Sequence, residues 1–207
     1  FASDFHFTSG NLSIEAESIT AVGHSLTVSG LTTLDAGSSN NISLTSANDF
    51  STVQILSGHH VTLNDVNGLS FAGSSHVSGN LTVTALGAIT NEADSSFIVD
   101  GVANLSGTSI DLGNETNDHV ELGSLNFHSI GDVLITADSS LTISAASTAG
   151  NLTLVASDDV SIDSEVNATG NTSITAGTTT GGIFVNAKLT SSGSLLLDAA
   201  DEIAINA

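Results

Sequence analysis

A seven-residue phrase that begins with glycine returns along the whole chain, and it constrains the fold more than any other feature. Its clearest copy is Gly-Asn-Leu-Thr-Leu-Val-Ala at Gly150, and related copies begin at Gly10, Gly30, Gly79, Gly101, Gly131, Gly170 and Gly193. A short unit that returns at a fixed period is typical of solenoids, in which each unit stacks on its neighbours. The repeat therefore predicts a rod in which each copy starts one coil.

Alignment of the copies predicts which residues face inward. The second and fourth residues after the glycine are apolar in most copies and the sixth is Ala or Gly, as in Leu152, Leu154 and Ala156. Apolar residues at every second position indicate a β-strand with one buried face. The small sixth residue indicates a corner where the chain turns inward. A ninth copy at Gly58 fits when it is shifted by one residue.

The spacing of the copies defines the predicted architecture. Successive glycines lie 19 to 30 residues apart, and further apolar pairs such as Leu141 and Ile143 follow the phrase. We therefore predict an all-β fold, a right-handed parallel β-helix of about nine coils with two or three short strands per coil. No linker interrupts the pattern, so residues 1–207 are expected to form a single β-solenoid domain. The absence of proline suits a ladder that needs most backbone N–H groups.

Two of the spacings are longer than the others and predict insertions. The surplus residues lie between Ser38 and Thr52 and between Asn114 and His128. Insertions on a solenoid commonly carry its binding function. These two segments are therefore the candidate binding loops.

Charge excludes several classes of partner. The chain has 22 acidic residues against a single base, Lys188, and its formal net charge is −21. Such a chain cannot neutralise phosphates, which argues against nucleic acids and anionic membranes as partners. It also lacks an apolar run long enough to span a bilayer. An acidic surface favours solubility and attracts cations.

The coils Gly-Asn-Leu-Thr-Leu-Val-Ala and Gly-Asp-Val-Leu-Ile-Thr-Ala resemble the right-handed β-helices of filamentous-haemagglutinin-type adhesins and related giant bacterial surface proteins. The resemblance covers nearly the whole chain. It implies secretion, an extracellular location at the cell surface, and a role in adhesion or assembly. It supplies no catalytic residues.

We expect no enzymatic activity and no required cofactor. Polysaccharide lyases built on β-helices need a basic residue to abstract a proton, and Lys188 is the only base besides histidine. Glycoside hydrolases need paired carboxylates in a cleft, and carboxylates are plentiful here. Sugar clefts usually also present aromatic platforms, however, and Trp and Tyr are absent.

The carboxylates suggest calcium sites. Glu15 and Asp35 occupy the same outward column in adjacent coils, so their side chains should lie close together. Asp158, Asp159 and Asp163 cluster near one turn. Stacked like charges either raise a pKa or recruit a cation, and carboxylate oxygens are the ligands that calcium prefers. A solvated acidic surface is the alternative interpretation.

Histidines suggest a second kind of metal site. His59 and His60 are adjacent in a predicted strand, so they should point to opposite faces and not chelate together. His119 and Glu121 share a face, with Asp118 nearby. The alternative for this group is a solvated loop.

Asn-x-Ser/Thr triplets form a set of candidate glycosylation sites. They occur at Asn11, Asn41, Asn80, Asn104, Asn114, Asn151, Asn167 and Asn171. Such triplets are glycosylation acceptors in secreted proteins. Several arise because asparagine follows the turn glycine, and asparagines stacked at one turn can instead form a hydrogen-bonded ladder along the axis.

The two ends of the chain look apolar and uncapped. Phe1, Phe5 and Phe7 crowd the N-terminus, Ile203 and Ile205 lie in the last strand pattern, and no helix or polar cap is evident at either end. The chain begins with Phe1 rather than Met, which favours a processed protein or a segment of a longer one. Uncapped solenoid ends expose strands that another copy can extend.

These features lead to one functional prediction and one alternative. We expect an extracellular structural protein that stacks end to end into a fibre, or that forms the stalk of a giant surface protein. Its partner is then itself, as a homopolymer or as neighbouring repeats of the same chain. The alternative is an adhesin module that presents the coil insertions to a glycan or a cell surface.

Overall fold

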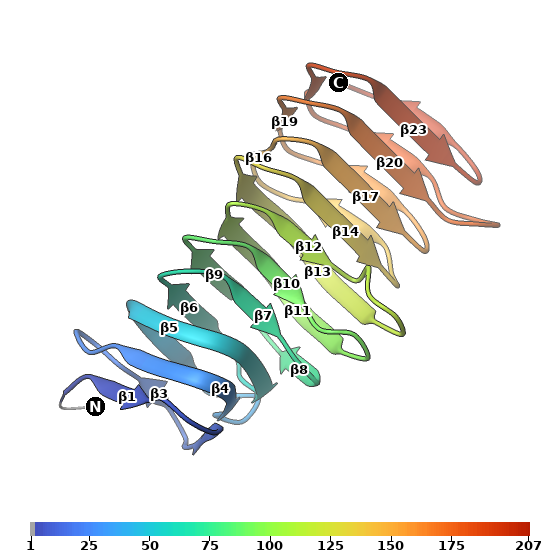
Figure 1. Cartoon of the computed structure of the whole chain (residues 1–207). Helices are drawn as coiled ribbons and strands as arrows, with labels where there is room; N and C mark the ends of the chain where they lie inside the picture. Colours follow the sequence, from blue (N-terminus) through green and yellow to red (C-terminus); the bar gives the residue numbers. More distant parts are fainter. Residues whose placement is uncertain (1–2) are drawn as a thin grey trace.

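The computed structural model describes residues 3–207, and its architecture is entirely β. Figure 1 shows strands stacked in successive turns along one axis, with the two chain ends at opposite ends of the rod. No helix occurs among the described residues. The predicted fold class, a solenoid of parallel β-strands, is confirmed.

The strands are short in the coils near the two ends of the rod. They are longer where one strand continues around a corner, as at Ile42–Ser57, Ser96–Gly107 and His119–Ser129. The first twelve are β1 (Phe5–Phe7), β2 (Leu12–Glu15), β3 (Ile19–Thr20), β4 (Leu26–Asp35), β5 (Ile42–Ser57), β6 (Val61–Asp65), β7 (Leu69–Phe71), β8 (Ser74–Val77), β9 (Leu81–Ala85), β10 (Ile89–Asn91), β11 (Ser96–Gly107) and β12 (Ile110–Leu112). The others are β13 (His119–Ser129), β14 (Val133–Ala137), β15 (Leu141–Ile143), β16 (Ser147–Ala149), β17 (Leu152–Ala156), β18 (Val160–Ile162), β19 (Val166–Ala168), β20 (Thr172–Ala176), β21 (Ile183–Val185), β22 (Leu189–Ser191), β23 (Leu195–Ala199) and β24 (Ile203–Ile205).

One ladder of parallel strands runs the length of the rod. It joins β2, β4, β5, β7, β10, β12, β14, β17, β20 and β23 in that order. Each coil contributes one strand to this first ladder, so the described residues make ten coils. Residues paired on it lie 18 to 23 positions apart, as Thr52 and Ser70 do at the short end and Ile110 and Val133 at the long end.

A second ladder forms another side of the rod. In the N-terminal and central coils it joins β3, β5, β6, β9, β11 and β13. The later coils have three separate strands each, as in β14, β15 and β16, and these pair with the equivalent strands of the next coil. The predicted two or three strands per coil are therefore observed.

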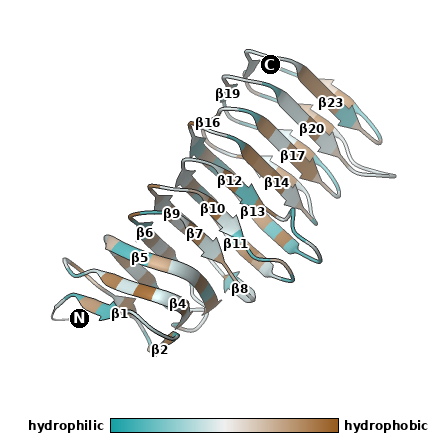
Figure 2. Cartoon of the chain, in the orientation of Figure 1, coloured by the Kyte–Doolittle hydropathy of each residue, from teal (hydrophilic) through white to brown (hydrophobic). Residues whose placement is uncertain are grey.

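The core is one continuous column of inward side chains. Along β17, Leu152, Leu154 and Ala156 are at most 2% exposed, whereas the intervening Thr153 and Val155 face outward and are half-buried. Figure 2 shows hydrophobic positions, in brown, separated by paler positions along β4. The period of two that the sequence displays therefore does mark the inward face.

The prediction that each glycine phrase starts a new coil on one face is wrong for three copies. The copies at Gly58, Gly79 and Gly101 lead into β6, β9 and the second half of β11, which belong to the second ladder. Within that ladder Val61 pairs with Leu81, so the one-residue shift of the copy at Gly58 is confirmed. The spacings of 28 and 30 residues each join a glycine that precedes one ladder to a glycine that precedes the other. They are therefore not the lengths of single coils.

The two predicted insertions are also wrong. The surplus between Ser38 and Thr52 falls mostly in β5, which pairs with the coils on both sides. The segment Asn114–His128 falls mostly in β13, which pairs with β11 over most of its length. Only the short turn between β12 and β13 stands outside the ladder there. A turn of the same length joins β20 and β21 at residues 177–182, and Figure 1 shows it projecting from the rod.

Candidate functional site

The predicted calcium residues lie where the sequence placed them, but they do not converge. Glu15 and Asp35 are register partners in adjacent coils, which confirms their shared outward column. The Asp35 carboxylate also accepts the N–H of Gly37 at 3.0 Å. Two stacked carboxylates can attract a cation. They supply too few oxygen ligands, however, to enclose a calcium ion.

The aspartates at the second predicted site each engage a different partner. Asp158 accepts the hydroxyl of Ser140 at 3.3 Å, and Asp159 accepts the N–H of Gly182 at 2.8 Å. Asp163 accepts Asn186 Nδ2 at 2.8 Å and Ser161 Oγ at 2.7 Å, and these two bonds lower its pKa. Among residues 3–207, no three His, Cys, Asp or Glu side chains gather as they would to hold a metal ion.

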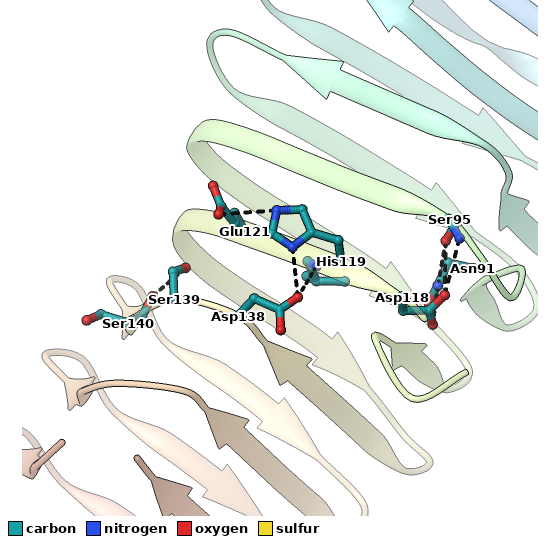
Figure 3. Close-up of polar contacts among 9 residues, drawn as sticks. Asn91, Ser95, Asp118, His119, Glu121, Asp138, Ser139 and Ser140 are labelled. Atoms are coloured by element: carbon teal, nitrogen blue, oxygen red, sulfur yellow. Dashed lines mark hydrogen bonds and ion pairs between the residues drawn. The ribbon is translucent and has the colours of Figure 1, made fainter. Parts of the chain in front are cut away.

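A polar cluster on the surface centres on His119, as Figure 3 shows. His119 Nε2 lies 3.2 Å from Glu121 Oε1, and His119 Nδ1 lies 3.0 Å from Asp138 Oδ2. The same Asp138 oxygen accepts the N–H of Val120 at 3.0 Å. Glu121 shares the strand of His119, as predicted, while Asp138 comes from the next coil. The cluster therefore ties two coils together.

Asp118 points away from His119 and organises the turn before β13 (Figure 3). Its carboxylate accepts Asn91 Nδ2 at 2.7 Å and the N–H of Glu115 at 2.9 Å. Asn91 also donates to Ser95 Oγ at 2.8 Å. Asp118 is therefore close to His119 in sequence but does not join His119 and Glu121, because it lies in the turn before β13 and bonds Asn91 and Glu115 there.

His59 and His60 also differ from the prediction. They lie in the turn before β6 rather than in a strand, and their rings are 4.1 Å apart between centroids. His60 Nδ1 accepts the N–H of Asn80 at 3.0 Å, and His59 Nδ1 lies 3.3 Å from Ser78 Oγ. The two rings thus face one another at a corner, and His60 links its coil to the next.

Most of the sequon asparagines take part in the same kind of link between coils. Their side-chain oxygens accept a backbone N–H from the following coil: Asn11 from Leu31, Asn41 from His60, Asn80 from Val102, Asn151 from Asn171 and Asn171 from Ser194, all at 2.8 to 3.1 Å. Asparagines are therefore stacked as a ladder at one glycine-marked corner, where Asn151 accepts from Asn171. At the other corner His60 lies between Asn41 and Asn80 and accepts the N–H of Asn80 in their place. Asn104 accepts Asn126 Nδ2 at 2.8 Å, and Asn114 bonds Asp111. Asn167 is exposed.

Sequence reasoning missed a buried polar pair in the N-terminal coils. Asn48 is fully buried, and its amide bonds backbone groups of Leu26, Leu44, Ser46 and Asn64 at 2.9 to 3.0 Å. Its register partner Asp65 is 4% exposed and accepts the N–H groups of Phe50 and Asn67 at 2.8 Å. Burial raises the pKa of Asp65, and the two N–H bonds oppose that shift. The sequence does contain a sign of this burial: Asp65 follows Val61 and Leu63 at the next alternate position, which faces the core.

The ends of the rod expose apolar side chains. At the C-terminal coil Leu195, Leu196, Ile203 and Ile205 are 50%, 56%, 46% and 67% exposed, and a hollow of about 290 Å³ opens between Leu189, Leu197 and Ile205. At the other end Phe5 and Phe7 are half-buried and stack with their ring centroids 6.1 Å apart. Phe1 lies outside the described residues. Asp4 holds this end to the next coil through the N–H of Ser25, a bond that lowers its pKa.

Taken together, the ladders and corner bonds define a β-solenoid repeat protein. Comparison with protein families matches residues 4–57 and 58–126 to the family described as repeats of unknown function (DUF5649). The two matches cover more than half of the chain, so the chain belongs to this family. Each matched segment holds three coils of the first ladder.

Other comparisons add no relative. No curated protein and no solved structure gives a significant match to the chain. Among the described residues, no helix has the length and apolar character needed to cross a membrane.

Proposed function

We propose that this chain is a structural rod whose terminal coils are extended by further coils. The extension occurs between copies that stack end to end into a fibre, or within the stalk of a longer surface protein. The proposal rests mainly on the C-terminal coil. Leu195 there is 50% exposed, whereas Leu152, at the same place in an inner coil, is 1% exposed.

Strand pairing supplies the mechanism. Among the described strands, β23 pairs only with β20 and β24 only with β21, so each has one edge of backbone N–H and C=O groups open. An added coil would bond that edge and cover Leu195, Leu197 and Ile205. Full burial of one such aliphatic side chain stabilises by about 1.5–3 kcal/mol. The N-terminal coil offers the opposite edge, with Leu12 and Ile14 half-buried.

The surface chemistry fits a rod that must stay dispersed. A formal net charge of −21 makes copies repel one another along most of their length. Addition at the ends brings only a small area of each rod together and buries the apolar side chains that are exposed there. We further propose an extracellular, cell-surface location and kinship with filamentous-haemagglutinin-like proteins, on the strength of the sequence resemblance. The proposed role involves no catalysis and no cofactor.

The adhesin alternative has lost its main support. It relied on two insertions that would display a binding surface, and both segments lie in β5 and β13. A stalk or fibre role needs no such loops.

Sedimentation velocity and negative-stain electron microscopy test the proposal. The wild type is expected to form open-ended, rod-shaped assemblies that lengthen with concentration. The double variant Ile203→Asp/Ile205→Asp should stop this lengthening, because it places charges on the open edge. Ser157→Asp adds a charge to an exposed corner beside Asp158 and serves as the control. Lengthening that is equal in all three proteins contradicts end addition.

A further inference from the structure

One side of the rod carries no outward-facing charged side chain over five consecutive coils. It consists of the outward side chains of β6, β9, the second half of β11, the second half of β13 and β16, together with the corners that follow the first four of these. We call it the uncharged face. Its outward rows are Thr62, Thr82 and Asn104, then Asn64, Thr84, Ser106, His128 and Thr148. Its corner row is Val66, Leu86, Thr108 and Ile130.

No carboxylate or lysine projects from this face, although the chain carries 22 acidic residues. The single acidic residue in these segments is Asp65, whose side chain points inward and is 4% exposed. Carboxylates bound the face at its margins. The half-buried Asp49 lies one coil before Val66 and accepts Asn67 Nδ2 at 2.8 Å. The exposed Asp132 follows Ile130 by two residues. Two copies that meet through the uncharged face therefore bring no carboxylates from that face together.

The corner row is also the most exposed aliphatic surface away from the ends. Ile130 is 87% exposed, Leu86 is 71% exposed and Val66 is 40% exposed. They lie in line along the rod axis, and Leu86 and Ile130 flank the smaller Thr108. Aliphatic side chains gathered in this way on a surface usually mark an interaction site.

The shape of the face complements itself. A hollow of about 310 Å³ lies over Thr108 between Leu86 and Ile130, and a second of about 280 Å³ adjoins it, with Ser106 and His128 lining both. A twofold axis between Thr108 and Ile130 would place the Ile130 side chain of each copy in the hollow over Thr108 of the other. Twofold interfaces require this reciprocity, in which one patch carries both the projection and the recess.

We propose that the uncharged face is a lateral docking surface for a second, antiparallel copy of this chain. Five coils at about 4.8 Å each, and about 20 Å of strand, give a footprint near 500 Å² per copy. That area is at the lower limit for a specific interface, so the pair is expected to be weak on its own. In a fibre, many such contacts act together and bundle rods side by side. The proposal does not depend on end-to-end addition.

Other occupants fit the face less well. Neutral glycans would match its hydroxyl and amide groups, but the chain has no Trp or Tyr, and this face presents no aromatic ring besides histidine. The exposed aliphatic row instead calls for an apolar counterpart. The same aliphatic row on a second copy is such an apolar counterpart, and the charges of that copy lie outside its uncharged face.

Sedimentation velocity in the Ile203→Asp/Ile205→Asp background tests the proposal, since that background suppresses lengthening. We expect a monomer–dimer equilibrium in which the dimer becomes tighter as salt is added. Salt screens the repulsion between the acidic residues that lie outside the uncharged face on the two rods. Leu86→Asp/Ile130→Asp should weaken the dimer about tenfold or more, and Ser157→Asp should not. Circular dichroism must show that each variant retains the wild-type strand signal and melting temperature.

Two results would overturn lateral pairing. One is a background protein that stays monomeric at every concentration and salt level. The other is a dimer that Leu86→Asp/Ile130→Asp leaves unchanged. A monomer that is retained on a neutral polysaccharide, and is released by Ile130→Asp, would likewise reject pairing and assign the face to glycans. Failure of end addition would appear separately, as a wild type that never exceeds the background in size.

Discussion

Two buried threonines should be the weakest places in the core. Thr32 and Thr172 occupy the first inward place after their glycines and are 0% and 2% exposed. Among the described residues, neither Oγ1 has a hydrogen-bond partner. Thr32 is flanked in the ladder by Leu12 and Val53, so its hydroxyl faces apolar neighbours. A buried hydroxyl without a partner costs about 1–3 kcal/mol.

Valine at these places should therefore stabilise the protein. Thr32→Val and Thr172→Val keep the branched shape and replace the unpaired hydroxyl with a methyl group. Each should raise the free energy of unfolding by about 1–3 kcal/mol. Thr172 should gain less than Thr32, because its neighbour Leu195 is 50% exposed and admits water to that end. The two sites lie seven coils apart, about 34 Å, so the double variant should show the sum.

Urea unfolding followed by far-ultraviolet circular dichroism provides the measurement. The transition midpoint should rise while the slope with urea stays the same. Thr153→Val, at an outward place on β17, is the matched control and should change stability by no more than about 0.5 kcal/mol. If both inward variants are neutral or destabilising while the control is neutral, the two hydroxyls are satisfied and the reasoning is wrong.

Further predictions concern the corners, the buried carboxyl and metal dependence. Because burial raises the pKa of Asp65 in the folded state, its contribution to stability is present below its unfolded pKa and is lost as pH rises through its folded pKa. The free energy of unfolding of the wild type, minus that of Asp65→Asn, should therefore fall as pH rises above about 4, and a difference that does not change with pH contradicts this. Gly150→Ala should lower stability by about 1–3 kcal/mol in urea unfolding, since a Cβ there would lie 2.9 Å from backbone atoms of the preceding coil. Asn151→Ala should cost about 1 kcal/mol, and Asn167→Ala should stay within about 0.5 kcal/mol, because only Asn151 accepts an N–H from the next coil; equal losses would reject the ladder. Chelation with EDTA should leave the melting temperature unchanged, and a clear drop would show that calcium supports the fold.

The inward columns could be predicted from the sequence because a strand imposes a period of two whatever coil it belongs to. Leu152, Leu154 and Ala156 illustrate this, since burial alternates along β17 as their pattern indicates. Side-chain partners across coils could not be predicted in the same way. Asp138 reaches His119 from 19 residues away, and nothing local to either residue marks that contact.

Charge patterning gave a misleading picture of the acidic clusters. Asp158, Asp159 and Asp163 are close in sequence, which suggested shared ligation. The chain turns between them, and each carboxylate is taken up by a donor of its own, such as Gly182 N–H for Asp159. Residues that are close in sequence at a corner therefore point in different directions. Residues that share a register position in adjacent coils have side chains that lie close together.

The glycine phrase misidentified the coils because it is a signature of corners, and the rod has more than one corner that needs it. At one corner Gly30 lies against the backbone of Gly10 and Asn11 accepts the N–H of Leu31; at the other, Gly101 lies against Gly79 and Asn80 accepts the N–H of Val102. At both corners the backbones of adjacent coils are so close that only a residue without Cβ fits, and a side-chain oxygen accepts an N–H from the next coil. The same geometry therefore favours Gly followed by Asn at both corners. The spacings of 28 and 30 residues then exceed one coil by about eight residues, the length of one side, which is the expected result when the phrase moves from one corner to the next.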